Sequence, residues 1–424
     1  MHVVRNIKLF TKLKGFFKII FGQGLIQILG LVIGFVLVRS LSKDDYKIYT
    51  VLMSIQAMMA TLSGSGIMIG FQKIAGGIWN DNWALSSLLK TARHIRERIL
   101  ILSIIVSCIY GYAIFYQQGV SAIKSLSYLL LIILVVYPEI QKSFLRAALL
   151  LRKEVTLLQI TSVIQQGLRA LLIFIYLLVF NEYFEIYIVL LISVCSSWLS
   201  NVYIQKKSLI IFPNVGVIEP QYKNTLYDYI KKVWHNSLFF TFKGQVSILL
   251  IGLFGSGENL ANLGALTRFS LAFAFITSVI NLTIIPHFGR ERTVRKLKSL
   301  YILSIVSWIL FSLLTLILLY FMQNRALSLL GSQYSGLNHE FMLVIVNGLI
   351  GIAIGLFQGL NYSKGWMKYN TYFSIPLDIL SIVVGALLFD VTKLSGVLQM
   401  SIFTSCIGLT LILSNTIQGF YCKS

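Results

Sequence analysis

The chain has 424 residues, of which 57% are hydrophobic and 12% charged, and its mean hydropathy is +0.80. A soluble domain carries about 25% charged residues, so this composition excludes a soluble enzyme and predicts an integral membrane protein. The formal net charge of +21 does not indicate nucleic-acid binding, because the basic residues gather at alternate ends of apolar segments, as they do in membrane proteins.

Twelve apolar runs are long enough to cross a bilayer, which takes about 20 residues each. They are centred on Leu29, Met59, Val106, Leu131, Leu171, Val189, Leu249, Phe275, Leu313, Ile350, Val384 and Ile407. The segments between them are too short to form a soluble domain with its own core. We therefore expect an all-α integral membrane protein with about twelve transmembrane helices.

The distribution of basic residues predicts the orientation of these helices. If the N-terminus is cytoplasmic and the spans alternate, the cytoplasmic segments hold 27 of the 36 Lys and Arg residues and the external segments hold 6. The positive-inside rule then places both termini in the cytoplasm. The basic start, MHVVRNIKLFTKLKGFFK, is not followed by a small-residue cleavage site, so we expect a retained first span rather than a signal peptide.

The first span carries Gln23, Gln27, Gly30 and Gly34 on one helical face. Two interpretations are open for this face. The glutamines can line a cavity, or they can bond across a close helix–helix interface that the glycines permit.

The external turn that follows, SLSKDDY, is very short. We expect Asp44 or Asp45 to cap the second helix. Arg39, at the end of the first span, is expected either to reach the outer headgroups or to guard the external mouth of a cavity.

In the fourth span, Glu139 directly follows Pro138, and in the eleventh span Asp378 lies two residues after Pro376. Either acid could bind a proton or Na⁺ that drives a transport cycle. The alternative is a structural ion pair, for which Lys142 or Arg146 is the expected partner of Glu139.

The fifth span contains the clearest polar stripe. Gln159, Ser162, Gln166 and Arg169 are spaced three, four and three residues apart, which places them on one face of a helix. A charged side chain at the bilayer centre costs about 2.5 to 3.5 kcal/mol, so Arg169 is expected to face the protein interior or a wet cavity. The stripe predicts one wall of a hydrated, cationic cavity.

A cytoplasmic linker follows the sixth span and contains Pro213 and Pro220. After it, Leu226, Ile230 and Val233 repeat at helical spacing, which predicts an amphipathic helix on the inner leaflet or a solvated loop helix. The linker divides the chain into two halves that begin with the same orientation. The expected domains are an N-terminal six-helix bundle, 1–205, the linker, 206–235, and a C-terminal six-helix bundle, 236–424. Parallel repeats of this kind are related by a pseudo-two-fold axis along the membrane normal and bind substrate between them near the midplane.

The second half adds two cations within spans. Lys243 lies about two turns inside the seventh span, and Arg268 lies beside a polar stripe in the eighth. The alternatives are that Lys243 reaches back to the headgroups and that Arg268 anchors the interface. With Arg169, these residues bias the interior towards positive charge, which favours a phosphate or pyrophosphate substrate.

No pattern in the sequence indicates catalysis. The chain lacks a phosphate-binding GxxxxGK[ST] loop, and its five His and four Cys residues show no metal-ligand spacing. We therefore expect no catalytic residue, no metal site and no enzymatic activity.

The stretch LVRSLSKDDY, followed by LSGSGIMIGFQKIAGG, resembles the N-terminal signature of polysaccharide and O-antigen flippases of the MATE-like multidrug/oligosaccharidyl-lipid/polysaccharide exporter superfamily. Arg39, Asp45 and Tyr46 stand at the matching positions, whereas Lys47 stands where the family often has glycine. The motif covers Gln23 to Gly77, and beyond it the resemblance is one of hydropathy.

The resemblance implies a flippase that moves an undecaprenyl-diphosphate-linked oligosaccharide, for O-antigen lipopolysaccharide or for capsule, to the outer leaflet of the bacterial plasma membrane. It also implies alternating access. From the two acids within spans we expect a coupling H⁺ or Na⁺, and no other cofactor. The expected partners are membrane lipids and a polysaccharide polymerase or chain-length regulator. The residues expected to contact substrate are Arg169, Lys243, Arg268, Arg39, Gln166, Gln23 and Gln27.

Two other functions compete with this prediction. A drug or toxin antiporter of the same superfamily would bind cations through acids, whereas this interior carries more Lys and Arg than Asp and Glu. A membrane glycosyltransferase would use Asp44 and Asp45 to hold a metal, but their loop is too short to bind an acceptor.

Overall fold

The computed structural model describes residues 22–64, 66–180, 184–212 and 216–421, so the basic start at residues 1–18 and Pro213 lie outside it. Within these ranges, ten helices are long and apolar enough to cross a membrane. The helices α2, Lys43–Gly64, and α3, Ile67–Ile78, pass the same test together and are bent by 50° at their junction. One shorter apolar helix, Tyr372–Leu388, lies within α13.

Each of the twelve expected spans is centred in a different one of these helices. The prediction of an all-α, multi-pass membrane protein is thereby confirmed. The result follows from the bilayer itself, since a chain that crosses hydrocarbon must satisfy its backbone groups internally.

Contacts between Cα atoms divide the described chain into two compact units. Unit 1 contains the described residues up to Ile33 and those from Ser40 to Leu253, and unit 2 contains 34–39 and those from Phe254 onwards. The boundaries that we expect at residues 205 and 236, and the axis between the two bundles, stay predictions.

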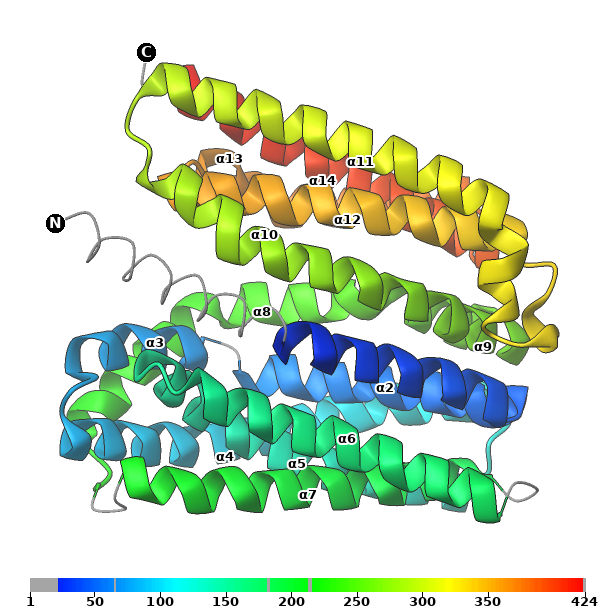
Figure 1. The fold of residues 1–424 in the computed structure, drawn as a ribbon, viewed down its shortest axis with the longest axis horizontal. Coiled ribbons are helices and arrows are strands. Elements are labelled where there is room, and N and C mark those ends of the chain that lie inside the picture. The colour runs from blue at the N-terminus through cyan, green and yellow to red at the C-terminus, as the bar shows by residue number, and fades with distance from the viewer. Residues whose placement is uncertain (1–21, 65, 181–183, 213–215, 422–424) are drawn as a thin grey trace, which may run out of the picture. The chain divides into compact units, whose positions relative to one another are not determined.

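Unit 1 contains the first part of the helix Gly22–Ser40, up to Ile33, and six further helices besides α3. These are α2, α4 (Asn82–Gln117), α5 (Ala122–Leu151), α6 (Val155–Val179), α7 (Ile186–Ile211) and α8 (Pro220–Phe254). The helices α5 and α6 both pack against α7, and α2 packs against α4 and α5 (Figure 1).

The core of unit 1 contains residues of α3, α4, α5, α7 and α8. The rings of Phe71 and Phe144 lie 5.1 Å apart, and Leu226 is fully buried in the same cluster. The helix expected here is present, but its predicted position on the leaflet surface is wrong. Its residues form the first turns of the uninterrupted helix α8, and Leu226 and Ile230 pack against protein rather than lipid.

A buried arginine that the sequence patterns do not single out joins three helices of unit 1. Arg96 of α4 is 5% exposed and donates to the Ile140 carbonyl at 3.2 Å, to Ser143, and to Ser63 at 3.3 Å. Its guanidinium also stacks 4.9 Å from the Phe144 ring centroid. These contacts fix α2, α4 and α5 to one another, because an unpaired buried charge would be costly.

The turn before α2 is capped by a serine rather than by an aspartate. The Ser42 hydroxyl accepts the Asp45 N–H at 3.1 Å, and Asp44 instead pairs with Lys47 at 2.7 Å. The predicted aspartate cap is therefore wrong, because α2 begins at Lys43 and both acids lie inside the helix rather than before it. The acids still lie in the first turn, where the helix dipole favours negative charge.

Unit 2 begins with a similar turn, in which the Ser256 hydroxyl accepts the Asn259 N–H at 3.2 Å. Its helices are α9 (Gly257–Leu266), a 3₁₀ turn (Thr267–Phe269), α10 (Ser270–Arg290), α11 (Val294–Ser328), a second 3₁₀ turn (Ser332–Tyr334), α12 (Asn338–Lys364), α13 (Lys368–Leu388) and α14 (Leu394–Tyr421).

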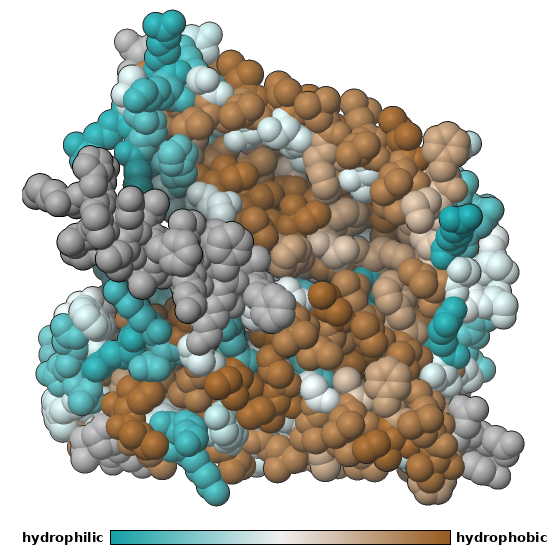
Figure 2. Space-filling view, viewed as in Figure 1, coloured by the Kyte–Doolittle hydropathy of each residue, from teal (hydrophilic) through white to brown (hydrophobic). Residues whose placement is uncertain are grey.

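The helix α12 is central in unit 2, because α10, α11 and α14 all pack against it (Figure 1). The helix α11 is the opposite case, since none of its most apolar stretch is buried. Figure 2 shows hydrophobic side chains along α11 beyond the hydrophilic residues at its N-terminal end. This helix is therefore a lipid-facing wall of unit 2.

We expect Gly66→Ala to destabilise the protein by more than about 1 kcal/mol. Gly66 has φ +71°, and an added Cβ would lie 2.8 Å from the Ile230 Cα of α8. Gly76→Ala is the matched control, since that glycine lies in helix α3 with open space around its Cβ position. Thermal unfolding in detergent should show a lower Tm for Gly66→Ala only, and equal Tm values for the two variants would contradict the packing of α3 on α8.

Candidate functional site

A polar cavity of about 250 Å³ lies within unit 1. Apolar side chains such as Ile132 and Leu190 form part of its wall. Its polar lining comes from α2, α5, α6 and α7 and consists of Gln56, Glu139, Arg146, Ser162, Gln165, Gln166, Arg169, Ser193, Ser196 and Ser197. The cavity is therefore a concentrated polar site inside an apolar bundle.

Proline shapes the α5 wall of this cavity. Pro138 lies inside α5 and has no N–H, so the Leu134 carbonyl loses its usual partner one turn earlier. The Trp198 indole of α7 donates to that carbonyl at 3.0 Å. This bond replaces the missing one and fixes α7 against α5 next to Glu139.

Glu139 is held in a hydrogen-bonded network with Lys142, which is only 1% exposed. The Lys142 ammonium donates to Glu139 at 2.8 Å, to the Gln165 carbonyl oxygen at 2.8 Å and to Ser200 at 3.1 Å. The Gln165 amide and the Ser197 hydroxyl also donate to Glu139. An ammonium has three donors, and all three are used here.

The structural ion pair expected for Glu139 is therefore present, with Lys142 rather than Arg146 as its partner. This pair is electrically neutral overall. Among the described residues, Glu139 is the acid that lines the cavity, and this pair removes it as a free negative charge in this state.

Two arginines remain on the cavity wall. Arg146 donates to Ser162 at 2.9 Å, and Arg169 donates to the Tyr49 hydroxyl at 3.1 Å. The Arg169 Nε is buried and has no hydrogen-bond partner among the described residues. A guanidinium has five N–H donors, so these contacts leave donors for a ligand. Beyond the neutral pair, the cavity carries two positive charges and favours an anion.

Three of the four residues in the predicted stripe, Ser162, Gln166 and Arg169, do line one cavity. Gln159 does not line it and makes its contacts elsewhere. Gln165 lies on the same face, three residues from Ser162 and four from Arg169, and belongs to the site although the stripe did not include it.

Gln23 and Gln27 are half-buried in the first described helix and do not line this cavity, whereas their neighbour Ile26 does. Within unit 2, a Cβ on Gly34 would lie 3.1 Å from the Arg268 Cδ. The absence of a side chain at Gly34 thus leaves room for the Arg268 stem. At Gly34 the glycine therefore permits close packing, which is one of the two interpretations given above for this helical face.

The other predicted cations are not among the residues that line the unit 1 cavity. Lys243 of α8 lies 5.9 Å from the Phe240 ring centroid and is not a lining residue. Arg39 donates to the Ser328 carbonyl at 2.6 Å, at the end of α11, where a cation is favourable to the helix dipole. The convergence of Lys243, Arg268 and Arg39 with Arg169 on one substrate stays a prediction.

Asp378 is 4% exposed within α13 of unit 2. The Ser381 hydroxyl donates to its backbone carbonyl at 2.9 Å. Glu139 and Asp378 therefore belong to different units, and a coupling role for either acid stays a prediction.

The sequence patterns missed the serine contribution of α7. Four buried serines of α7 are spaced three, one and three residues apart: Ser193, Ser196, Ser197 and Ser200. That spacing is a helical face of small polar residues, and it was visible in the stretch SVCSSWLS.

Comparisons with known proteins agree on the fold. No family model matches the chain, and no curated protein matches it in sequence. Among solved structures, the lipid II flippase MurJ in an inward closed conformation has a TM-score of 0.70 at 14% identity, covering 96% of this chain and 89% of that one. An inward-facing multidrug resistance MATE family transporter of the MOP superfamily has a TM-score of 0.66 at 13% identity, covering 93% of both chains.

A third similar structure, the Vibrio cholerae MATE transporter VcmN in a bent form, has a TM-score of 0.57 at 13% identity and covers 96% of this chain and 97% of that one. The likeness to these structures extends over nearly the whole chain. This protein therefore has the fold that MATE transporters share with the lipid II flippase.

We expect Lys142→Ala to destabilise the protein by roughly 3 kcal/mol, because it leaves Glu139 in the bundle without its cation. Lys393→Ala is the matched control: it breaks another pair spaced three residues apart, Lys393 with Asp390 at 3.2 Å, but one whose side chains are 72% and 47% exposed. Thermal unfolding in detergent should give a clearly lower Tm for Lys142→Ala than for Lys393→Ala. Equal Tm values would show that the buried pair does not stabilise the bundle.

Proposed function

We propose that this protein is a transporter that moves an undecaprenyl-diphosphate-linked oligosaccharide from the cytoplasmic to the outer leaflet of the bacterial plasma membrane by alternating access. The observation that carries the proposal is the cavity charge: with Glu139 neutralised by Lys142, Arg146 and Arg169 leave an excess of positive charge. A diphosphate has the charge and the acceptor oxygens that such arginines bind. The fold shared with a lipid II flippase supports a lipid-linked substrate.

In this proposal, Arg169 and Gln166 contact the substrate headgroup directly from α6. Lys243, Arg268, Arg39, Gln23 and Gln27 are proposed as further contacts during the transport cycle. A polysaccharide polymerase or chain-length regulator would receive the product on the outer side. The glycan would be part of O-antigen, capsule or another surface polysaccharide.

A cation-coupled drug antiporter is the second candidate, and the MATE transporters of the same fold favour it. Its substrate would need an acid with a free negative charge in the cavity. Glu139, the acid on this cavity wall, is already paired at 2.8 Å with Lys142. A glycosyltransferase is disfavoured because Asp44, one of the two acids that would hold its metal, is already paired with Lys47 at 2.7 Å.

Arg169 tests the proposed function. We expect Arg169→Ala to lower the transport rate about ten- to a hundredfold, because the charge-assisted bonds of one guanidinium are worth about 1.5 to 3 kcal/mol. Arg169→Lys should retain more activity if positive charge is the main requirement. Tyr49→Phe is the control, since it removes the hydroxyl that Arg169 contacts at 3.1 Å and keeps the cavity charge.

The measurement is complementation of a strain that lacks the gene, with the protein level checked by immunoblotting. In the uncomplemented strain, complete undecaprenyl-diphosphate-linked repeat units should accumulate on the inner leaflet. Truncated glycans would instead indicate a transferase, and normal surface glycan with altered drug tolerance would indicate an antiporter. Full activity of Arg169→Ala would remove this residue from the site.

We further propose that Glu139 and Asp378 bind the coupling ion, H⁺ or Na⁺. In Glu139 the ion would compete with the Lys142 ammonium for the same carboxylate, so ion binding and the internal pair would alternate. In proteoliposomes, an imposed H⁺ or Na⁺ gradient should accelerate transport by the unaltered protein. Glu139→Gln and Asp378→Asn should each abolish that acceleration, and retained acceleration in both variants would exclude these acids as coupling sites.

A further inference from the structure

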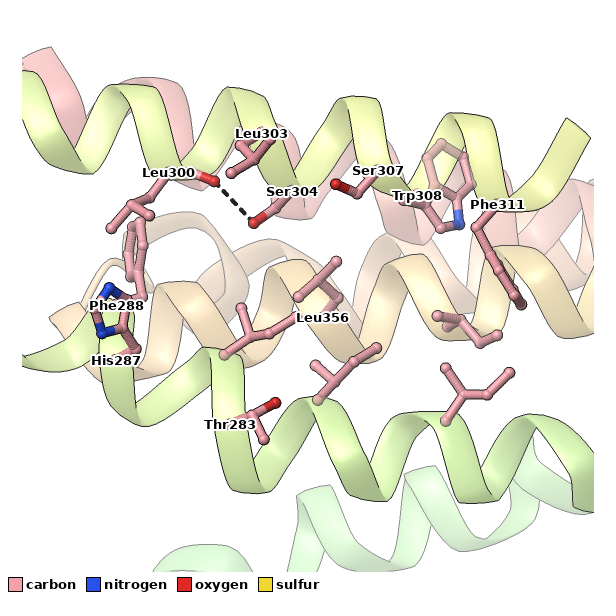
Figure 3. A pocket seen from close by; sticks show the side chains of 14 residues that line it. Thr283, His287, Phe288, Leu300, Leu303, Ser304, Ser307, Trp308, Phe311 and Leu356 are labelled. Carbon is pink, nitrogen blue, oxygen red and sulfur yellow. Dashed lines mark hydrogen bonds between the residues drawn. The ribbon is translucent and has the colours of Figure 1, made fainter. Parts of the chain in front are cut away.

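A second cavity, of about 390 Å³, lies within unit 2 and has the opposite chemistry. It is a groove between α10 and α11, which both pack against α12, and α12 contributes Ile352 and Leu356 to its floor (Figure 3). None of its lining residues belongs to the polar cavity of unit 1. An inference about this groove is therefore independent of the proposed transport substrate.

Most of the groove wall is apolar, and three of its five polar side chains donate hydrogen bonds inside the protein, whereas Ser307 and His287 complete the lining. The Ser304 hydroxyl donates to the Leu300 carbonyl at 2.8 Å, as the dashed line in Figure 3 shows. The Thr283 hydroxyl donates to the Val279 carbonyl at 2.7 Å, and the Trp308 indole N–H donates to the Leu349 carbonyl of α12 at 3.0 Å. The groove therefore offers a hydrocarbon-like surface, which binds an apolar chain and not a polar headgroup.

The groove is accessible from the membrane. Ile284 on one wall is 39% exposed, and Leu303 and Phe311 on the other are 60% and 37% exposed. The lining residues of α11, from Leu300 to Phe311, are all exposed or half-buried. A lipid chain can thus enter sideways from the bilayer without passing through the protein.

The length of the groove matches one leaflet. On α11 its lining runs from Leu300 to Phe311, and on α10 from Ile276 to His287. Eleven residues of helix rise about 16 Å, and one leaflet is about half of a 30 Å hydrocarbon core. A phospholipid acyl chain has this reach, whereas an undecaprenyl tail is several times longer.

One end of the groove is basic. His287 and Phe288 lie at the end that leads into the α10–α11 turn (Figure 3). The stretch HFGRERTVRKLK at this end contains five Lys and Arg residues and a single acid, Glu291. The positive-inside rule assigns such a turn to the cytoplasmic leaflet, where anionic headgroups are attracted by about 1 kcal/mol per basic residue.

The turn keeps a net positive charge although its one acid, Glu291, stays ionised. The Glu291 carboxylate accepts the N–H groups of Arg292 and Thr293 at 3.0 and 2.9 Å, and these bonds lower the pKa of its carboxyl. The Lys364 ammonium donates to the backbone carbonyls of Gly289 and Glu291, at the C-terminal end of α10. Its charge offsets the negative end of that helix.

We propose that this groove binds one acyl chain of an anionic phospholipid of the cytoplasmic leaflet, with the lipid phosphate at the basic α10–α11 turn. The chain fills the space between α10 and α11 and completes the packing of both helices on α12. The bound lipid is a structural component of unit 2, distinct from any transported lipid.

Trp308 lines the groove and reports on its occupant. The protein would carry Trp308 alone, with its five other tryptophans replaced by phenylalanine, in vesicles that contain phosphatidylglycerol or phosphatidylcholine with brominated acyl chains. Half-maximal quenching of Trp308 should require a roughly fivefold lower mole fraction of phosphatidylglycerol than of phosphatidylcholine. The double substitution Arg290→Gln and Arg292→Gln should abolish this preference.

Ser304→Phe fills the groove and should remove the saturable quenching. The matched control is Ile309→Phe on the same helix, because Ile309 is 42% exposed and does not line the groove. Equal quenching by the two lipids would overturn the proposal. Displacement of brominated phosphatidylglycerol by a lower mole fraction of undecaprenyl phosphate would also overturn it, and would assign the groove to a polyprenyl chain.

Native mass spectrometry provides a test that does not depend on the single-tryptophan variant. The unaltered protein, extracted in mild detergent, should retain phosphatidylglycerol, and Ser304→Phe should lose it while Ile309→Phe keeps it. Failure of the unaltered protein to retain any anionic phospholipid would contradict the proposal.

Discussion

The structure depends on one constraint of the bilayer: a charge or backbone carbonyl inside a bundle needs a partner within the protein. The Lys142 ammonium meets this constraint through Glu139, Gln165 and Ser200, which brings α5, α6 and α7 together. The carbonyl that Pro138 leaves without a partner meets it through Trp198. These polar bonds give position and orientation to helices whose apolar surfaces alone would slide against one another.

The same constraint separates two kinds of interior space. In unit 1 the cavity retains Arg146 and Arg169 beyond the neutral pair, so it has spare donors and a net positive charge. In unit 2 most of the groove wall is apolar, and Ser304 and Trp308 each donate to a backbone carbonyl. One space suits an anionic headgroup and the other a hydrocarbon chain, although both lie among apolar helices.

Much of the fold could be predicted because hydropathy and charge are local properties of the sequence. Each predicted span is centred in a helix, and the spacing of Ser162, Gln166 and Arg169 correctly predicted a shared polar face. The predictions failed where the outcome depended on distant residues. Leu226 was expected at a lipid surface, but the core of α3 and α4 covers it, and no pattern in α8 shows what will pack against it.

The sequence by itself determined the class of protein, the helices and the polar face of α6, because each follows from composition or from helical spacing within one segment. Only the tertiary structure decided that Glu139 pairs with Lys142, that Gln165 and the α7 serines complete the cavity, and that Arg39 meets the end of α11. Apart from the Glu139–Lys142 pair, which lies within α5, these contacts join residues from different helices. Their geometry depends on how whole helices pack, which no single segment encodes.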